Sequence, residues 1–200
     1  MIKNIIFDFG DIFINLDKQA PLLEMAKFGF TEMTPELDII FKDYETGLME
    51  SDEFVNRLQT IFSNASKEQI TKAWNSIILD FPEKRLTFIE NLNSENQYRL
   101  FLLSNTNDLH IDIVKKSMGL DRFNRFKNCF EMFYLSQEMK MRKPNANIYE
   151  YVLHENKLIA DETFFVDDTK ENTDSASKLG IHCWNLQVGK EDIREILSHL

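Results

Sequence analysis

The stretch that most constrains the fold is the N-terminal run from Asn4 to Phe13. It begins with Asn-Ile-Ile-Phe, and Asp8 follows at once, ahead of a glycine and a second acid. This pattern predicts a short buried strand that carries Asp8 out of the core at its C-terminal end. In open α/β sheets, ligands bind in the crevice outside those strand ends. Asp and Gly are also common in turns, so this stretch alone leaves a plain acidic turn open.

Composition indicates a globular protein that does not bind nucleic acid. The chain has 200 residues, 43% of them hydrophobic and 17 of them Phe, enough for one domain with a core and a small insertion. Its formal net charge of -10 repels phosphate backbones, although a bound divalent cation can reverse the local field for a small phosphorylated substrate. Cys129 and Cys183 are too few for a disulfide framework, and neither has zinc-type spacing.

The sequence also argues against a membrane or a secretory role. The apolar N-terminus carries Asp8, Asp11 and Asp17, which a secretory signal peptide lacks. No uninterrupted apolar run approaches the ~20 residues of a membrane-spanning helix. We therefore expect a cytoplasmic protein with no membrane partner.

Residues 17–80 have a helical period and no strand pattern. Four helices are expected there: around 22–26, from Thr34-Pro35, from Ser51 to about Phe62, and from Ser66 to an end between Trp74 and Leu79. Four short helices between one strand and the rest of the chain indicate an inserted helical subdomain. A core of its own is expected from Phe28, Phe30, Phe41, Phe54 and Phe62. The turn at 44–47, Tyr-Glu-Thr-Gly, is either an ordinary interhelical turn or a part of the insertion that reaches over the site.

From residue 81 onward, strands alternate with helices. The expected strands are 98–103, 129–135, 163–166 and 181–186, and the expected helices are 85–92, 108–118, 147–154, 170–179 and 191–200. This alternation predicts an α/β fold with a Rossmann-like parallel sheet and helices on both faces. Residues 1–16 and 81–200 are expected to form this core domain, and residues 17–80 the helical domain inserted into it.

Polar side chains follow the expected strands at four places along the chain. They are Asp8, Ser104, Lys143 and the pair Asp167-Asp168. Because the C-terminal ends of parallel strands share one edge, all four can meet in a single crevice. Carboxylate oxygens can hold a hard cation such as Mg²⁺, and a carboxylate can also attack phosphorus. A hydroxyl and an ammonium group are donors suited to a phosphoryl group.

These segments resemble the four motifs of the haloacid dehalogenase (HAD)-like hydrolases, of the phosphatase type. The motifs are Phe7-Asp8-Phe9-Gly10-Asp11-Ile12, Leu102-Leu103-Ser104-Asn105-Thr106, Arg142-Lys143-Pro144, and Phe164-Phe165-Val166-Asp167-Asp168 with Asn172. Each motif alone is weak, but the four in this order are specific, and the resemblance runs from end to end. The helices at 17–80 resemble the family's helical cap of the first insertion class.

The resemblance implies a nucleophile and a metal site. Asp8 would be the nucleophile and a ligand of Mg²⁺, together with the backbone carbonyl of Gly10. Asp168 would bind the metal directly, with Asp167 next to it or acting through water. Each of these acids has an ordinary alternative, because Asp167 and Asp168 could instead cap the helix that follows them.

The resemblance also implies a phosphate site. Ser104, the backbone amide of Asn105 and the ammonium group of Lys143 would hold the phosphate group. Lys143 would in addition neutralise Asp8, so that a dianionic substrate can approach a carboxylate. Taken alone, Ser104 could be a helix N-cap and Lys143 a solvated loop charge.

One departure from the family pattern concerns proton transfer. Typical family phosphatases have a second Asp two residues after the nucleophile, as general acid and base, and this chain has Gly10 there. A subgroup resembling sugar-phosphate phosphatases also has Gly at that position, but usually Gly or Asn where this chain has Asp11. Loss of a proton donor slows such reactions by ~10²–10⁴-fold. Two hypotheses follow: Asp11 takes the acid/base role, or the leaving group needs no donor.

The sequence therefore predicts a Mg²⁺-dependent phosphatase that forms an aspartyl-phosphate on Asp8. Its expected substrate is a small phosphorylated metabolite, such as a sugar phosphate. Two alternatives stay open. One is a 2-haloacid dehalogenase, in which the same Asp8 attacks carbon without a metal. The other is a regulator that binds phosphate or metal with little or no turnover. The chain is expected to be a monomer or a homodimer.

Overall fold

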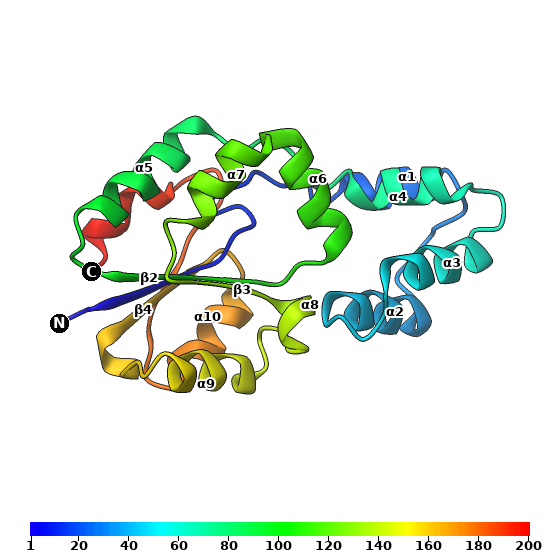
Figure 1. Cartoon of the computed structure of the whole chain (residues 1–200). Helices are drawn as coiled ribbons and strands as arrows, with labels where there is room; N and C mark the ends of the chain where they lie inside the picture. Colours follow the sequence, from blue (N-terminus) through cyan, green and yellow to red (C-terminus); the bar gives the residue numbers. More distant parts are fainter.

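The core of the fold is a five-stranded sheet in which all neighbouring strands are parallel. The computed structural model describes all residues, Met1–Leu200. The strands are β1 (Asn4–Phe7), β2 (Arg99–Ser104), β3 (Met132–Leu135), β4 (Thr163–Asp167) and β5 (His182–Asn185), in the order β3-β2-β1-β4-β5. The first strand of the chain thus lies in the middle of the sheet (Figure 1).

Register brings the ends of the three central strands to one edge. Phe7 of β1 is paired with Leu102 of β2 on one side and with Val166 of β4 on the other. The chain positions that follow these residues are therefore neighbours at the C-terminal edge, where parallel α/β sheets form their ligand crevice.

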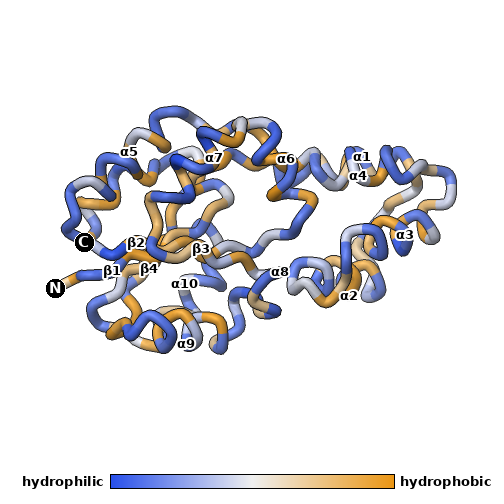
Figure 2. Tube along the Cα trace, in the orientation of Figure 1, coloured by the Kyte–Doolittle hydropathy of each residue, from blue (hydrophilic) through white to orange (hydrophobic).

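Helices cover both faces of the sheet (Figure 1). One face carries α5 (Glu83–Ser94), α6 (Asp108–Met118), α7 (Leu120–Lys127) and the 3₁₀-helix η2 (Ile193–Ser198), and the other carries α9 (Ala146–Glu155) and α10 (Lys170–Ser177). Short helices α8 (Ser136–Met139) and η1 (Ala160–Glu162) complete the core. In Figure 2 the apolar residues lie mostly on the strands and on the helix sides that face them. The predicted α/β fold class is confirmed.

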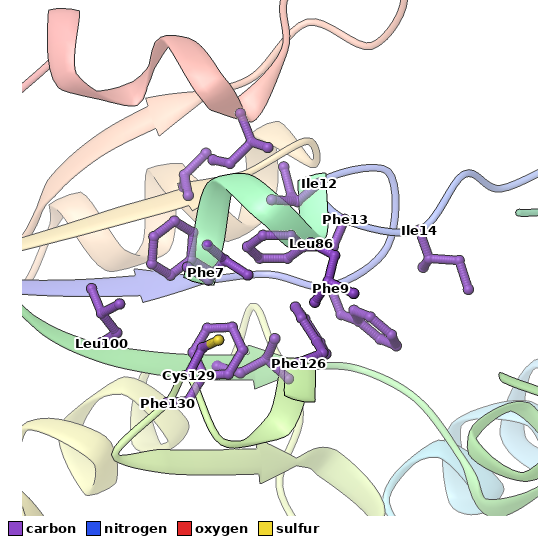
Figure 3. Packing of buried hydrophobic residues seen from close by; sticks show 14 of the residues in the cluster. Phe7, Phe9, Ile12, Phe13, Ile14, Leu86, Leu100, Phe126, Cys129 and Phe130 are labelled. Atoms are coloured by element: carbon purple, nitrogen blue, oxygen red, sulfur yellow. The ribbon is translucent and has the colours of Figure 1, made fainter. Parts of the chain in front are cut away.

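Phenylalanines hold the loop that follows β1. Phe9 and Phe13 are buried, and each packs against Phe126 of α7, with ring centroids 5.4 and 4.9 Å apart. Phe7 contacts Phe13 at 5.5 Å, so the strand and the loop share one aromatic cluster (Figure 3). Aromatic pairs at such spacings add stabilisation beyond the burial of their area. This packing fixes the backbone on either side of Asp8.

Four helices, α1 (Ala20–Ala26), α2 (Pro35–Glu45), α3 (Ser51–Ile61) and α4 (Lys67–Asn75), form the insertion. They extend from one end of the sheet (Figure 1) and have a hydrophobic cluster of their own. Thr34 caps α2 ahead of Pro35, and Ser66 and Gln69 form a capping box at the start of α4. Phe54 and Phe62 lie inside this cluster, and the other three phenylalanines predicted to join it pack against it.

The structure differs from the sequence predictions in several elements. Lys143 does not follow a strand directly, because the short helix α8 and a turn separate it from β3. Strand β3 begins at Met132 rather than at Cys129, and the last predicted helix is the 3₁₀-helix η2. Helix α7 has no counterpart among the predicted elements, because Gly119 both ends α6 and precedes α7.

None of the helices has the length and apolar character that crossing a lipid bilayer requires.

Candidate active site

A polar pocket lies at the C-terminal edge of the sheet. It has a volume of about 300 Å³ and one hydrophobic residue among the residues that line it. Those residues are Asp8, Gly10, Leu16, Lys18, Glu45, Asn105, Arg142, Lys143, Pro144, Asp168, Thr169, Glu171 and Asn172. The lining combines the segment after β1, the loops after β2 and β4, the loop before α9, and the end of α2. Segments far apart in the sequence thus converge on one small cavity.

A buried ammonium group joins two carboxylates at this edge of the sheet, Asp8 in the pocket lining and Asp167 behind it. Lys143 Nζ lies 2.7 Å from Asp8 Oδ1 and 2.6 Å from Asp167 Oδ2. The side chains of Lys143 and Asp167 are 1% and 0% exposed, so the contacts form away from bulk water. Charge-assisted hydrogen bonds of this length offset part of the cost of burying the three charges.

Burial dominates the electrostatics of Asp8. Desolvation raises the pKa of Asp8 to about 7, and the like charges of Asp167 and Asp168 act in the same direction. Lys143 opposes them, because its ammonium group favours the ionised carboxylate. A further positive charge beside Asp8 would therefore stabilise the ionised form that nucleophilic attack requires.

Three acids at this edge make a donor set that fits a divalent cation. One carboxylate oxygen from each of Asp8, Asp167 and Asp168 lies within 4.8 Å of the others. Hard cations such as Mg²⁺ take oxygen ligands of this kind. The carboxylates therefore suit a metal ion by their chemistry as well as by their proximity.

Asp167 is already bound on both of its oxygens. Asn172 Nδ2 donates to Oδ1 and Oδ2 at 3.0 and 2.9 Å, and the backbone N–H of Thr169 donates to Oδ1 at 2.8 Å. Lys143 occupies Oδ2 as well. This favours Asp167 as the residue that orients Lys143 and leaves Asp8 and Asp168 as the better ligands.

Asn105 fixes the pocket wall next to Lys143. Its side-chain amide donates to the carbonyl of Lys143 and accepts from the N–H of Lys143, both at 2.9 Å, which fixes the backbone of that residue. The backbone N–H of Asn105 has no hydrogen-bond partner in the protein. Ser104 is 2% exposed, and its hydroxyl makes only a long contact of 3.4 Å with the carbonyl of Asn105. Both groups remain able to donate to a ligand.

Asp11 lies near the pocket but does not line it. Its backbone is left-handed, with φ of 56°, and its Oδ1 accepts from the N–H of Leu16 at 3.0 Å. Its Oδ2 pairs with Lys18 Nζ at 3.0 Å, and the same ammonium group lies 2.5 Å from Asp168 Oδ2. Lys18, which lines the pocket, therefore links Asp11 to Asp168. In this structure Asp11 is thus bound to Lys18 and to the backbone of Leu16, beside the pocket rather than in its lining.

Comparison with known proteins identifies the family of the chain. The family model for haloacid dehalogenase-like hydrolases matches residues 5–186. The chain belongs to this family. The prediction of a HAD-like hydrolase, made from four short motifs, is therefore confirmed.

Several known HAD proteins resemble this one over their whole length. A D-ribitol-5-phosphate phosphatase from Bacteroides thetaiotaomicron is 26% identical, with 98% of this chain and 97% of the relative covered. A mutant HAD family enzyme from the same organism, solved with magnesium and inorganic phosphate, is 35% identical over 96% of each chain, with a TM-score of 0.84. A predicted HAD-like hydrolase from Porphyromonas gingivalis has a TM-score of 0.83 and 26% identity, covering 99% and 97%.

Eight pocket residues of this HAD-like hydrolase had no role assigned from the sequence. They are Leu16, Lys18, Glu45, Arg142, Pro144, Thr169, Glu171 and Asn172. Asn172 and Arg142 lie in recognised motifs, so their proximity to the site could have been anticipated. Glu45 belongs to the turn at 44–47, and its place in the lining agrees with the alternative in which this turn reaches over the site. Lys18 had no such signal in the sequence.

Proposed function

We propose that this hydrolase is a Mg²⁺-dependent phosphatase that acts on a small phosphorylated metabolite, with sugar phosphates as the favoured class. The observation that carries the proposal is the contact of Lys143 with both Asp8 and Asp167, beside a third acid, Asp168. A carboxylate held against an ammonium group can attack phosphorus while the cation balances the developing charge. Two relatives add support, because one is named for phosphatase activity on D-ribitol 5-phosphate and another was solved with magnesium and phosphate.

In the proposed reaction, an oxygen of Asp8 attacks the phosphorus atom in line with the ester oxygen. The P–O ester bond breaks, an aspartyl-phosphate forms, and the leaving oxygen takes a proton from a water molecule to depart as the alcohol. A water molecule then attacks phosphorus, which releases inorganic phosphate and restores the Asp8 carboxylate. Lys143, the free N–H of Asn105 and the hydroxyl of Ser104 are proposed to donate to the phosphoryl oxygens.

The proposed metal ligands are Asp8, Asp168 and the backbone carbonyl of Gly10, with Asp167 beside them. When bound, Mg²⁺ supplies positive charge that offsets both the carboxylates and the phosphate group. Burial raises the pKa of Asp8 and so favours its protonated form, which cannot attack phosphorus. A bound cation would favour the ionised form, and for this reason we expect the activity to depend on metal.

The test is release of phosphate from 4-nitrophenyl phosphate, followed with Mg²⁺ and with excess EDTA. We expect activity with Mg²⁺ and its loss in EDTA. Replacing the nucleophile, Asp8→Asn, should lower kcat at least ~10³-fold, as losses of nucleophiles do. Activity that does not need metal, or normal activity in Asp8→Asn, would contradict the proposal.

The dehalogenase and the regulator predict different results, which two further assays distinguish from phosphatase activity. A 2-haloacid dehalogenase would release halide from 2-chloropropionate, and metal would not affect the rate. A regulator would bind phosphate but hydrolyse none of a panel of metabolites. The closeness of Asp8, Asp167 and Asp168 favours the metal-dependent phosphatase. The cytoplasmic location and the monomeric or homodimeric state remain predictions from the sequence.

A further inference from the structure

The turn between α2 and α3 reaches from the insertion into the pocket. Glu45 is the last residue of α2, and it lines the same cavity as Asp8. Its side chain is 28% exposed, and burial raises its pKa. A partly buried carboxylate at this position contacts whatever part of a substrate lies beyond the phosphate group.

Contacts to the core fix the backbone of this turn. The hydroxyl of Ser136, which is fully buried, donates to the carbonyl of Glu45 at 2.6 Å. Lys140 donates to the carbonyl of Gly47. Gly47 has φ of 62°, and a Cβ there would clash with the backbone carbonyl oxygen of Gln137. Only a glycine lets the turn approach α8 this closely, so the position of Glu45 is well determined.

Arg142 stands next to Glu45 in the pocket wall. Its Nη2 donates to Glu45 Oε2 at 3.0 Å, and it directly precedes Lys143 in the chain. Glu45 Oε1 accepts no hydrogen bond from the protein, and Arg142 Nη1 donates none. Arg142 Nε is shut away from the pocket and is not available to a ligand. The pair therefore leaves one acceptor, Glu45 Oε1, and one donor, Arg142 Nη1, free to bind a ligand.

A hydroxyl group matches this pair because it donates and accepts at once. The pocket offers a single hydrophobic residue, Leu16, so it lacks a wall for an aromatic group. A substrate carboxylate would meet Glu45 and be repelled. Glu45, Arg142 and Leu16 therefore favour phosphate esters whose alcohol part carries hydroxyl groups over those in which it carries a carboxylate or an aromatic ring.

We propose that Glu45 and Arg142 bind hydroxyl groups of the substrate and so select uncharged polyhydroxy phosphate esters over esters with a carboxylate or an aromatic group. This inference rests on the proposed phosphatase function of the same pocket. Glu45 acts as the specificity-determining residue, and Arg142 holds it in place and supplies the donor.

The test compares kcat/KM for three substrates: D-ribitol 5-phosphate, 4-nitrophenyl phosphate and 2-phosphoglycolate. In Glu45→Ala, the loss for ribitol 5-phosphate should exceed the loss for 4-nitrophenyl phosphate by about tenfold, mainly through KM, since a site built for hydroxyl groups loses most on them. In Glu45→Gln, the ratio of phosphoglycolate to ribitol phosphate hydrolysis should rise. Glu53→Ala is the matched control, because Glu53 pairs with Arg57 on the exposed side of the insertion and lies outside the pocket.

Equal losses on all three substrates would overturn the inference, because they would indicate a structural role. So would an unchanged selectivity in both Glu45 variants. A binding measurement separates this result from failure of the proposed function. If the protein hydrolyses none of the esters, calorimetry with ribitol 5-phosphate and with inorganic phosphate still applies. A preference for the polyol ester that Glu45→Ala abolishes would then support the inference and reject the phosphatase, and no preference would reject both.

Discussion

His110 shows at the scale of one residue how the insertion is joined to the core. It lies on α6 with its ring stacked on Trp74 of α4, at a centroid distance of 5.2 Å and an angle of 15°. Its Nδ1 is 3.0 Å from Asn107 Nδ2, and its Nε2 is 3.3 Å from the carbonyl of Trp74. Asn107 Oδ1 accepts from Trp74 Nε1, so its amide must donate to His110 Nδ1. This network, from which the tautomer is inferred, requires a neutral imidazole.

Protonation of His110 should therefore destabilise the folded protein. Burial lowers the pKa of His110 to about 4, below the value of about 6.5 in an unfolded chain. The unfolded state then binds the proton more readily, so stability is complete above pH 6.5 and is lost as the pH falls toward 4. Between pH 7.5 and pH 5, we expect His110 to account for a loss of about 2 kcal/mol in the free energy of unfolding.

Urea unfolding at the two pH values measures this loss. In His110→Gln, the difference between pH 7.5 and pH 5 should be smaller by that amount, even though the variant is less stable at both. His154→Gln is the control, because His154 is 87% exposed on α9. An equal pH dependence in His110→Gln and the unmodified protein would refute the assignment.

At the scale of elements, the α2–α3 turn depends on a glycine. Gly47→Ala would place a methyl group against the carbonyl of Gln137 in a left-handed backbone. Gly29→Ala, at the end of the α1 region, also has a positive φ, of 101°, but no atom within 4 Å of its Cβ. Both variants carry backbone strain, which is greater at Gly29, and only Gly47→Ala carries the clash. We expect Gly47→Ala to be less stable than Gly29→Ala by about 2 kcal/mol, in the range of overpacked sites.

Thermal unfolding of both variants, with the unmodified protein beside them, measures this difference. Gly47→Ala should also bind ribitol 5-phosphate more weakly than Gly29→Ala, because the clash moves Glu45 away from the pocket. Equal stability of the two variants would show that the turn does not need its close approach to α8.

The strands explain which parts of the site the sequence could predict. Asp8, Ser104 and Asp167 end or follow central strands, so local pattern and the parallel register together place them at one edge. Lys143 reaches the same place through α8 and a turn, where no periodicity is present. Glu45 reaches it only because the insertion packs against α8, which is a contact between residues 91 positions apart. The glycine-bearing turn at 44–47 could be recognised from the sequence, but not the non-local packing that decides where it lies.

At the scale of the whole molecule, charge decides how a phosphate ester can enter. The formal net charge of the chain is -10, and the pocket itself is lined by four carboxylates, Asp8, Glu45, Asp168 and Glu171. Three cations, Lys18, Arg142 and Lys143, line it as well, so the carboxylates exceed the cations. A dianionic phosphate group is therefore repelled by both the molecule and the pocket unless a divalent cation changes the balance.

Binding of inorganic phosphate should accordingly depend on Mg²⁺. With Mg²⁺ present and phosphate at a hundred times its Kd, binding to the folded state stabilises it by about 2.7 kcal/mol, which raises Tm by about 5–10 °C in a chain of this size. In EDTA, the same phosphate concentration should leave Tm within about 1 °C of its value without phosphate, because the ligand then meets a negative field. Scanning calorimetry gives both values, and sodium chloride at matched ionic strength controls for screening. An equal rise in Tm with and without metal would mean that Lys18, Arg142 and Lys143 suffice to bind phosphate, and that the carboxylates of this pocket are not there to hold a cation.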